Sequence, residues 1–270
     1  MSLPGQKHLR HWFWAVMFRF PKLRLRLTRL LVPAREMDVQ IFGAPLRIDS
    51  REEIGLWRAS KIADENVIFR DEAASLLNLA LLLQPGDVFI DIGANVGLYS
   101  SALARLRNVF AQNEFVAIEA NPATAARLQR SVDGRGVAVM NLGVSDRATE
   151  LAFAPGVTSG VFKVAAPGER EGVTKIHCDR LDALPLPAGD LVMKIDVEDH
   201  ELPVLEGAAG LFAAERIKVI YLDGYRGESI PPLLRGHGFA LFDGRTLARV
   251  TDEVPAFSLL AVHQSRLTNR

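Results

Sequence analysis

The sequence contains one cysteine, Cys178, in 270 residues. A single cysteine excludes an intrachain disulfide, and therefore a small disulfide-stapled fold, and it favours a reducing compartment. Long apolar runs are absent as well: residues 12–18 form a run of seven, far short of the ~20 residues that span a bilayer. Arg19 and Pro21 follow that run directly, where a signal peptide would carry small residues before its cleavage site. We therefore expect a cytoplasmic protein.

The chain also lacks net charge, because 32 Lys and Arg balance 32 Asp and Glu. Residues 1–36 nevertheless carry eight basic side chains against Glu36 alone, which leaves 24 basic and 31 acidic side chains, a net charge of −7, in the remainder. We interpret residues 1–36 as a basic amphipathic arm. Its aromatic residues, such as Trp12 and Phe18, favour peripheral contact with the inner surface of an anionic membrane. Leucines that share one helical face favour packing on the domain instead, and both alternatives stay open.

The most informative segment spans residues 85–97, PGDVFIDIGANVG. Its apolar residues 88–90 predict a buried parallel strand, and Asp91 follows at the carboxyl end of that strand. Gly93 and Gly97 then allow a tight turn into a helix, whose positive N-terminus faces the same place. Open α/β sheets bind ligands at such a strand end, so we expect a ligand site here.

The turn does not fit a nicotinamide site, which requires G-x-G-x-x-G, because Asn95 and Leu98 replace the second and third glycines. The pattern D-x-G-x-N-x-G resembles motif I of class I S-adenosylmethionine-dependent methyltransferases. A second apolar run ends in Glu119, 22 residues after Gly97, near the ~20-residue offset at which a carboxylate binds ribose hydroxyls. A generic α/β strand end is the alternative. The predicted cofactor-binding residues are Asp91, Gly93, Asn95, Gly97, Glu119 and Asn121, with Asp196 added below.

Residues 191–207, LVMKIDVEDHELPVLEG, carry a third pattern. It closely resembles the K-I-D-V-E-G-H-E…V-L-x-G signature of FkbM-type methyltransferases, S-adenosylmethionine-dependent enzymes known mainly for O-methylation of hydroxyls on sugars and natural products. The resemblance runs from about residue 37 to residue 262, with further matches at 180–182 and 236–239. Asp199 stands where the family has glycine, and Asp223 stands where glutamate is common.

The order of the predicted elements indicates an α/β class I methyltransferase (Rossmann-like) fold. It has a mostly parallel seven-stranded sheet, helices on both faces and an antiparallel C-terminal strand pair. We divide the chain into the arm 1–36, a hairpin and helices over 37–84, and a methyltransferase domain over 85–265. Residues 143–178 are predicted to be an inserted β excursion that shapes the acceptor pocket together with residues 51–75. The expected helices are 51–62, 71–83, 96–106, 122–132 and 229–235. One expected strand ends at Asp91, and the others span 115–119, 137–141, 191–195, 217–222, 238–242 and 256–262.

Methyl transfer from a sulfonium is a direct displacement, so catalysis rests mainly on alignment of the acceptor oxygen. A general base helps an alcohol acceptor by a factor of ~10²–10⁴. We predict that His200 is this base, oriented by Asp196 or Glu198, and that Asp196 also faces the cofactor because its strand neighbours the first strand. The alternative for His200 is a helix cap or a packing role.

Other charged residues have structural interpretations. Lys194, within an apolar strand, is predicted to pair with a carboxylate such as Asp182. Glu72 is interpreted as a helix-terminal acid, and the alternative is a side chain that reaches the cofactor pocket. Asp196 and Asp223 follow two strands and are ligand types that suit Mg²⁺. Such acids are common at strand ends and no denser cluster adjoins Asp223, so we predict no metal site.

These patterns predict an S-adenosylmethionine-dependent O-methyltransferase that acts on a hydroxyl of a carbohydrate, glycolipid or related natural product. Its partner is then a small-molecule or glycan acceptor. An RNA methyltransferase that uses the basic arm is an alternative, but residues 196–199 are acidic where a phosphate backbone would pass and an N-P-P-Y-like tetrapeptide is absent. A noncatalytic S-adenosylmethionine-binding module is a third possibility, disfavoured because packing gives no reason for acids such as Asp91 and Glu119.

Overall fold

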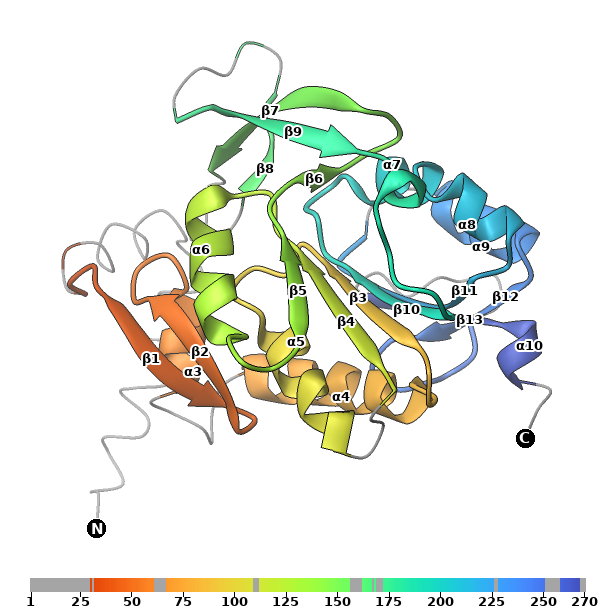
Figure 1. The fold of residues 1–270 in the computed structure, drawn as a ribbon, viewed down its shortest axis with the longest axis horizontal. Helices are drawn as coiled ribbons and strands as arrows, with labels where there is room; N and C mark the ends of the chain where they lie inside the picture. Colours follow the sequence, from red (N-terminus) through yellow and green to blue (C-terminus); the bar gives the residue numbers. More distant parts are fainter. Residues whose placement is uncertain are drawn as a thin grey trace, which may run out of the picture.

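The structure is a computed structural model that describes residues 30, 32–60, 67–108, 112–155, 162–166, 168, 172–225, 228–250 and 258–267 (Figure 1). Most of the predicted arm, residues 1–36, and the first two residues of the strand predicted over 256–262 lie outside these ranges. Among the described residues, no helix is both long enough and apolar enough to cross a bilayer.

Seven strands form the central sheet in the order β12-β13-β11-β10-β3-β4-β5 (Figure 1). The strands from β5 to β11 pair in parallel, and β13 runs antiparallel to both β11 and β12. This order confirms the predicted mostly parallel sheet with an antiparallel C-terminal pair. The strands are β3 (Val88–Ile92), β4 (Glu114–Ile118), β5 (Val137–Met140), β10 (Leu191–Ile195), β11 (Ile217–Asp223), β12 (Phe239–Asp243) and β13 (Ser258–His263).

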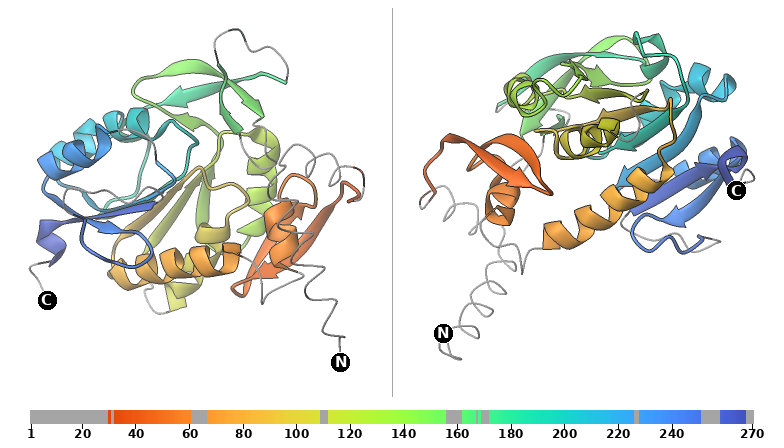
Figure 2. Two further views of the ribbon diagram at one scale, coloured as in Figure 1. Left: turned by 180° about the vertical axis from the view of Figure 1, so that it is seen from behind. Right: turned by 60° about the horizontal axis from the view of Figure 1, so that its bottom comes forward.

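Helices cover both faces of this sheet (Figures 1 and 2). One face carries α4 (Val67–Leu82), α5 (Leu98–Leu103), the 3-10 helix η2 (Ala104–Asn108) and α6 (Pro122–Ser131), and α3 (Ile54–Ala59) packs against α4 at the edge of this layer. The other carries η3 (Leu181–Ala183), α7 (Glu201–Glu206), α8 (Ala209–Ala213) and α9 (Ile230–Gly236), and α10 (Gln264–Leu267) follows β13.

Alternation along β3 and β10 decides which face each side chain joins. Ile90 and Met193 lie in the core with α7, α8 and α9, whereas Phe89 and Val192 lie in the core with α4, α5 and α6. Asp91 and Lys194 are each two residues beyond members of the second set. They therefore share the face that α4 and α5 cover.

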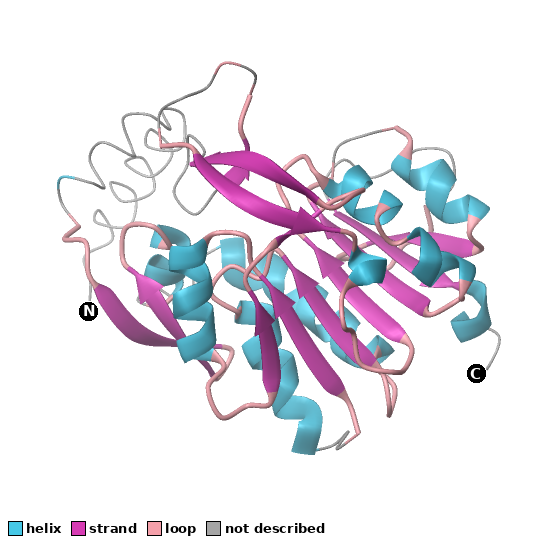
Figure 3. Ribbon diagram, turned by 45° about the horizontal axis from the view of Figure 1, so that its top comes forward, coloured by secondary structure: helices cyan, strands magenta, loops and turns pink. Residues whose placement is uncertain are grey.

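Two smaller sheets flank the central one. The hairpin of β1 (Glu36–Ile41) and β2 (Ala44–Asp49) packs beside α6, as Figure 2 shows. The accessory sheet, with the order β6-β9-β7-β8, consists of β6 (Gly143–Val144), β7 (Thr149–Pro155), β8 (Phe162–Val164) and β9 (Thr174–Asp179) (Figure 3). It confirms the β excursion predicted over 143–178.

Three predicted helix boundaries were wrong. α3 begins at Ile54 rather than at residue 51 because the Asp49 carboxylate accepts hydrogen bonds from the N–H groups of Arg51 and Glu52, at 2.8 and 3.1 Å, and holds them in a turn. α4 begins at Val67, so Glu72 lies in its second turn and is not the helix-terminal acid we predicted. The helix predicted over 96–106 begins only at Leu98 and continues as η2.

Candidate active site

The turn between β3 and α5 brings the backbone ends of β3 and β10 into contact. Gly93 has φ +74°, and a Cβ atom there would lie 2.8 Å from the carbonyl carbon of Asp196 and closer still to its oxygen. Gly97 has φ +88° and is the N-cap of α5. Asn95 has φ +50°, which asparagine tolerates better than most residues. Position 93 therefore admits only glycine without displacing β10.

This turn borders a cavity of about 300 Å³ at the carboxyl ends of the central strands, a volume at the small end of ligand pockets. The predicted residues that line it come from three separate parts of the chain, at 93–95, 119–121 and 196–200. They are Gly93, Asn95, Glu119, Asn121, Asp196, Glu198 and His200. The structure thus brings these seven residues together, while their roles stay predictions.

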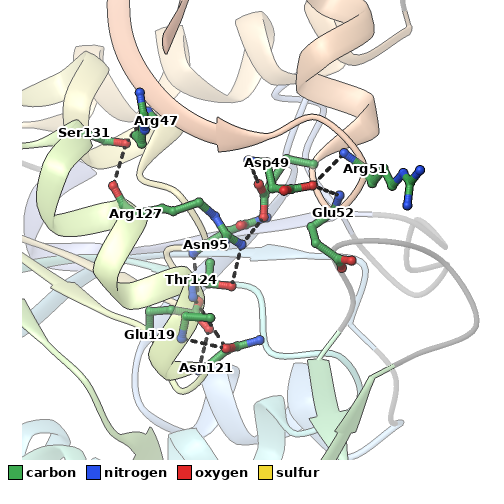
Figure 4. A network of polar contacts seen from close by, with 12 residues as sticks. Arg47, Asp49, Arg51, Glu52, Asn95, Glu119, Asn121, Thr124, Arg127 and Ser131 are labelled. Atoms are coloured by element: carbon green, nitrogen blue, oxygen red, sulfur yellow. Dashed lines mark hydrogen bonds and ion pairs between the residues drawn. The ribbon is translucent and has the colours of Figure 1, made fainter. Parts of the chain in front are cut away.

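Glu119 joins the end of β4 to the turn. Its buried carboxylate accepts hydrogen bonds from the N–H groups of Asn95, at 2.9 Å, and Asn121, at 2.8 Å (Figure 4). Burial raises the pKa of Glu119 to about 7, although both hydrogen bonds oppose that shift. The side chain of Asn121 caps α6 by accepting from the N–H groups of Ala123 and Thr124.

Asp91 and Gly97 do not line this cavity. Asp91 is buried, and its Oδ2 accepts hydrogen bonds from the N–H and Oγ of Ser100 at 3.1 and 2.7 Å. Burial raises the pKa of Asp91, and the nearby Lys194 ammonium and the Ser100 hydrogen bonds act against the shift. Asp91 therefore anchors the first turn of α5. It supports the segment between β3 and α5 from outside the cavity.

The predicted partner of Lys194 was wrong. Its ammonium lies 3.1 Å from Asp196 Oδ2, 3.7 Å from Asp91 Oδ1 and 4.8 Å from the centre of the Tyr99 ring. Asp182 pairs with Arg180 near α8, on the opposite face of the sheet. Burial alone would lower the pKa of Lys194, but the surrounding carboxylates, Asp196 first, raise it above its usual range.

Glu72 of α4 belongs to the same buried polar cluster. Burial raises its pKa to about 7, with Asp223 and Asp196 adding to the shift and Tyr99 and Lys194 opposing it. Its Oε2 has no hydrogen-bond partner among the residues that the structure describes. No group of three or more His, Cys, Asp or Glu within the described ranges is arranged to hold a metal.

His200 is the N-cap of α7, and its side chain makes no capping hydrogen bond. Its Nε2 lies 3.1 Å from the hydroxyl of Ser145. Burial lowers the pKa of His200, and Asp146 is the charged group that opposes this shift. Its hydrogen-bond partner is thus Ser145 rather than Asp196 or Glu198, which corrects the predicted orienting residue. The lowered pKa favours the neutral imidazole, the form that can accept a proton.

The loop from β10 to α7 explains the glycine of the family signature. Glu198 and Asp199 have φ values of +50° and +71°, where glycine is most easily accommodated and aspartate is tolerated better than most residues. The N–H of Asp199 donates to Glu201 Oε1 at 3.2 Å. The turn beside His200 therefore keeps a glycine-like geometry although Asp199 carries a side chain.

Several cavity-lining residues were missed from the sequence. Phe153 and Phe162 reach the cavity from the accessory sheet, Glu53 reaches it from the turn before α3, and Arg127 reaches it from α6. Ser145 contacts His200 although 55 residues separate them. Ser145 lies within the β excursion predicted over 143–178, and no local pattern in the sequence marks its contact with His200.

Comparison with known proteins settles the family. Residues 91–240, more than half of the chain, match the family described as "Methyltransferase FkbM domain". The chain belongs to the FkbM methyltransferase family. The resemblance seen in residues 191–207 is therefore confirmed, and with it S-adenosylmethionine as the cofactor of this family member.

One curated relative of this FkbM family member is the hexuronic acid methyltransferase AglP of Haloferax volcanii. The two are 30% identical over 177 residues, which span 63% of this chain and 66% of AglP, just under two thirds of its length. Among solved structures, a TehB-like methyltransferase from Corynebacterium glutamicum matches with 11% identity, coverage of 79% and 96%, and a TM-score of 0.44. Precorrin-6y C5,15-methyltransferase from Geobacter metallireducens matches with 18% identity, coverage of 76% and 92%, and a TM-score of 0.39. At these TM-scores neither similarity carries functional information.

Proposed function

We propose that the protein transfers the methyl group of S-adenosylmethionine to a hydroxyl of a carbohydrate or glycolipid. The observation that carries this proposal is the single cavity that the turn, Glu119 and the loop after β10 share. The residues fit the cofactor: Gly93 and Asn95 of the turn line the cavity, and the Glu119 carboxylate beside them can accept both protons of a vicinal diol.

S-adenosylmethionine supplies an electrophilic methyl group on a sulfonium. The protein then has to align an acceptor oxygen with that methyl group and accept its proton. Asp196 and Glu198 line the cavity beside the turn, where their carboxylates suit a positively charged cofactor. His200 borders the same space, and its neutral imidazole can take the acceptor proton.

The accessory sheet supports a sugar acceptor. Phe153 and Phe162 stack with ring centres 5.3 Å apart and interplanar angle 15°, and both line the cavity. Flat aromatic faces give the apolar C–H face of a sugar ring a surface to pack on. The Lys163 ammonium on the neighbouring position lowers the pKa of the cavity-lining Glu198, against the raising effect of burial. Lys163 itself does not line the cavity. The preference for an acidic sugar rests on the name of the relative AglP, a hexuronic acid methyltransferase.

An acceptor panel tests this function. With isotopically labelled S-adenosylmethionine, we expect methyl transfer to glycans that end in hexuronic acid, several-fold above transfer to neutral glycans. Because the methyl group goes to a hydroxyl, the label should survive mild alkali, which removes methyl esters. Salt-sensitive labelling of RNA would favour the nucleic-acid alternative, and S-adenosylhomocysteine binding without transfer to any acceptor would favour the noncatalytic module.

Cofactor binding should strengthen as the pH rises from 6 to 8. Glu119, with a pKa of about 7, must be ionised to accept both ribose protons, so the affinity for S-adenosylhomocysteine rises by at most ~10-fold per pH unit and levels off at higher pH. Glu119→Gln should bind weakly with a flat pH profile in calorimetry. Glu114→Gln, at the exposed start of β4, is the control and should keep the wild-type profile. A pH-independent wild-type affinity would contradict this role of Glu119.

We further propose that the arm, residues 1–36, attaches the protein peripherally to an anionic membrane. Eight basic side chains accompany the aromatic residues there, and each Lys or Arg near such a surface contributes about 1 kcal/mol. Deletion of residues 1–34 should abolish sedimentation with phosphatidylserine-containing vesicles and leave S-adenosylhomocysteine binding intact. Vesicles of phosphatidylcholine alone are the control. Unchanged sedimentation of the truncated protein would refute the membrane role, and lost cofactor binding would indicate an arm packed on the domain.

A further inference from the structure

One wall of the cavity comes from residues that precede the segment matching the family, residues 91–240. Glu52 and Glu53, just before α3, line the cavity together with Thr124 and Arg127 of α6. Figure 4 shows Thr124 and Arg127 in one polar network that extends from the hairpin to Asn95 and Glu119. The hairpin and α3 therefore take part in the site itself.

Arg127 and Glu53 form a buried ion pair in this wall. Arg127 Nη2 donates to Glu53 Oε1 at 2.7 Å and to Thr124 Oγ1 at 3.2 Å, and the two charged residues are 7% and 4% exposed. Glu53 is held in turn, because its Oε2 accepts a hydrogen bond from the Asp49 N–H at 2.6 Å. The guanidinium is thus fixed in place by the end of the hairpin.

The Nε of Arg127 is buried and has no hydrogen-bond partner among the described residues. An unpaired buried donor is costly, and native proteins rarely keep one without a partner. Because Arg127 lines the cavity, a ligand in the cavity can supply that partner. A guanidinium N–H donates a strong, charge-assisted hydrogen bond to a carboxylate, so a carboxylate is the ligand group that the remaining Nε donor suits best.

The amino-acid end of S-adenosylmethionine carries such a carboxylate beside an ammonium group. Glu119 lies next to the turn through its hydrogen bond with Asn95, so a ribose bound there places the rest of the cofactor within this cavity. The cavity wall formed by α6 and the turn before α3 carries the Arg127 guanidinium and the carboxylates of Glu52 and Glu53. These opposite charges complement the carboxylate and the ammonium of the amino-acid end of the cofactor. We propose that Arg127, positioned by Glu53, binds the carboxylate of the amino-acid end of the cofactor. This inference rests on the cofactor placement in the proposed function.

Two ligands that differ only at that end test the proposal. S-adenosylhomocysteine contains the amino acid, whereas 5′-methylthioadenosine keeps the adenosine and the thioether and lacks it. Arg127→Gln should weaken S-adenosylhomocysteine binding by ~10- to 100-fold in calorimetry, as expected for loss of a hydrogen bond to a charged group. Binding of 5′-methylthioadenosine should stay within about twofold of wild type. Arg127→Lys, which keeps the positive charge but lacks the Nε–H donor, should show a smaller loss of S-adenosylhomocysteine affinity.

Arg130→Gln is the matched control. Arg130 lies on the same helix, is 57% exposed and pairs with Glu36 outside the cavity, so both affinities should stay unchanged. Glu53→Gln should lower the affinity for S-adenosylhomocysteine, by less than Arg127→Gln does, and leave the affinity for 5′-methylthioadenosine unchanged. This variant tests the proposal if Arg127→Gln does not fold.

The outcomes separate the inference from the proposed function. If Arg127→Gln weakens the binding of both ligands equally, Arg127 only maintains the structure of the cavity wall, and the proposal is overturned. Unchanged affinity for both ligands would overturn it as well. If the wild-type protein binds neither ligand, the placement of the cofactor fails and the inference fails with it.

Discussion

Replacement of Gly93 by alanine is expected to abolish S-adenosylhomocysteine binding and to destabilise the fold by about 2–4 kcal/mol, the sum of a left-handed backbone conformation and an overpacked contact. The added Cβ would overlap the backbone carbonyl of Asp196. A backbone atom cannot swing aside as the end of a side chain can, so β10 itself would have to shift. Chemical denaturation measures the free energy of unfolding, and calorimetry measures the binding.

Gly134→Ala separates the two contributions. Gly134 has φ +67°, close to the +74° of Gly93, but a Cβ there meets no atom within 4 Å. The substitution Gly134→Ala should lower the free energy of unfolding only by the cost of the left-handed backbone conformation, about 1–2 kcal/mol, and should leave cofactor binding intact. If Gly93→Ala is no more destabilising than Gly134→Ala, the contact between the turn and Asp196 does not constrain the site.

Replacement of His200 by alanine is expected to lower turnover by a factor of ~10²–10⁴ with little change in S-adenosylhomocysteine affinity, because the imidazole acts only as charge develops on the acceptor oxygen. Activity of the wild-type enzyme should fall on the acid side, where His200 becomes protonated. Because burial lowers the pKa of His200, that fall should lie below the ordinary histidine range. Single-turnover rates and calorimetry on the same samples give both quantities.

Two further measurements make the His200 result specific. His177→Ala, on the exposed side of β9, is a control for histidine loss and should keep full activity. Wild-type activity should also survive exhaustive EDTA treatment. If Asp196 and Asp223 instead hold Mg²⁺, EDTA would remove activity and added Mg²⁺ would restore it. Metal-restorable activity in a fully active His200→Ala enzyme would overturn the assignment, whereas Asp196→Asn would damage either mechanism.

The sequence predicted the features that depend on neighbouring residues. The strand before Asp91, the glycine turn and the segment around Asp196 are each contiguous, and the order of elements along the chain placed their ends at one edge of the sheet. Helix starts were predicted less well. α3 starts late because the side chain of Asp49 captures the N–H groups of Arg51 and Glu52, a local competition that apolar periodicity does not report.

Contacts between distant segments were not predictable in the same way. The partner of Lys194 depends on which face of β10 it occupies, and that face is known only when the strand order and register are known. The contact of His200 with Ser145 joins residues 55 apart, and the pair Arg127–Glu53 joins residues 74 apart. No local pattern marks either pair, because each forms only when separate elements pack together.

The accessory sheet has a consequence for how this enzyme family can diversify. Phe153, Ile176 and Cys178 give that sheet a small hydrophobic core of its own, separate from the two cores of the central sheet. If the accessory sheet contacts the acceptor as we propose, substitutions on its cavity-facing side, at Phe162 for example, would change acceptor choice through a unit whose core is separate from β3, β4 and the glycine turn. Under that proposal, new substrates can be acquired while the donor site is preserved.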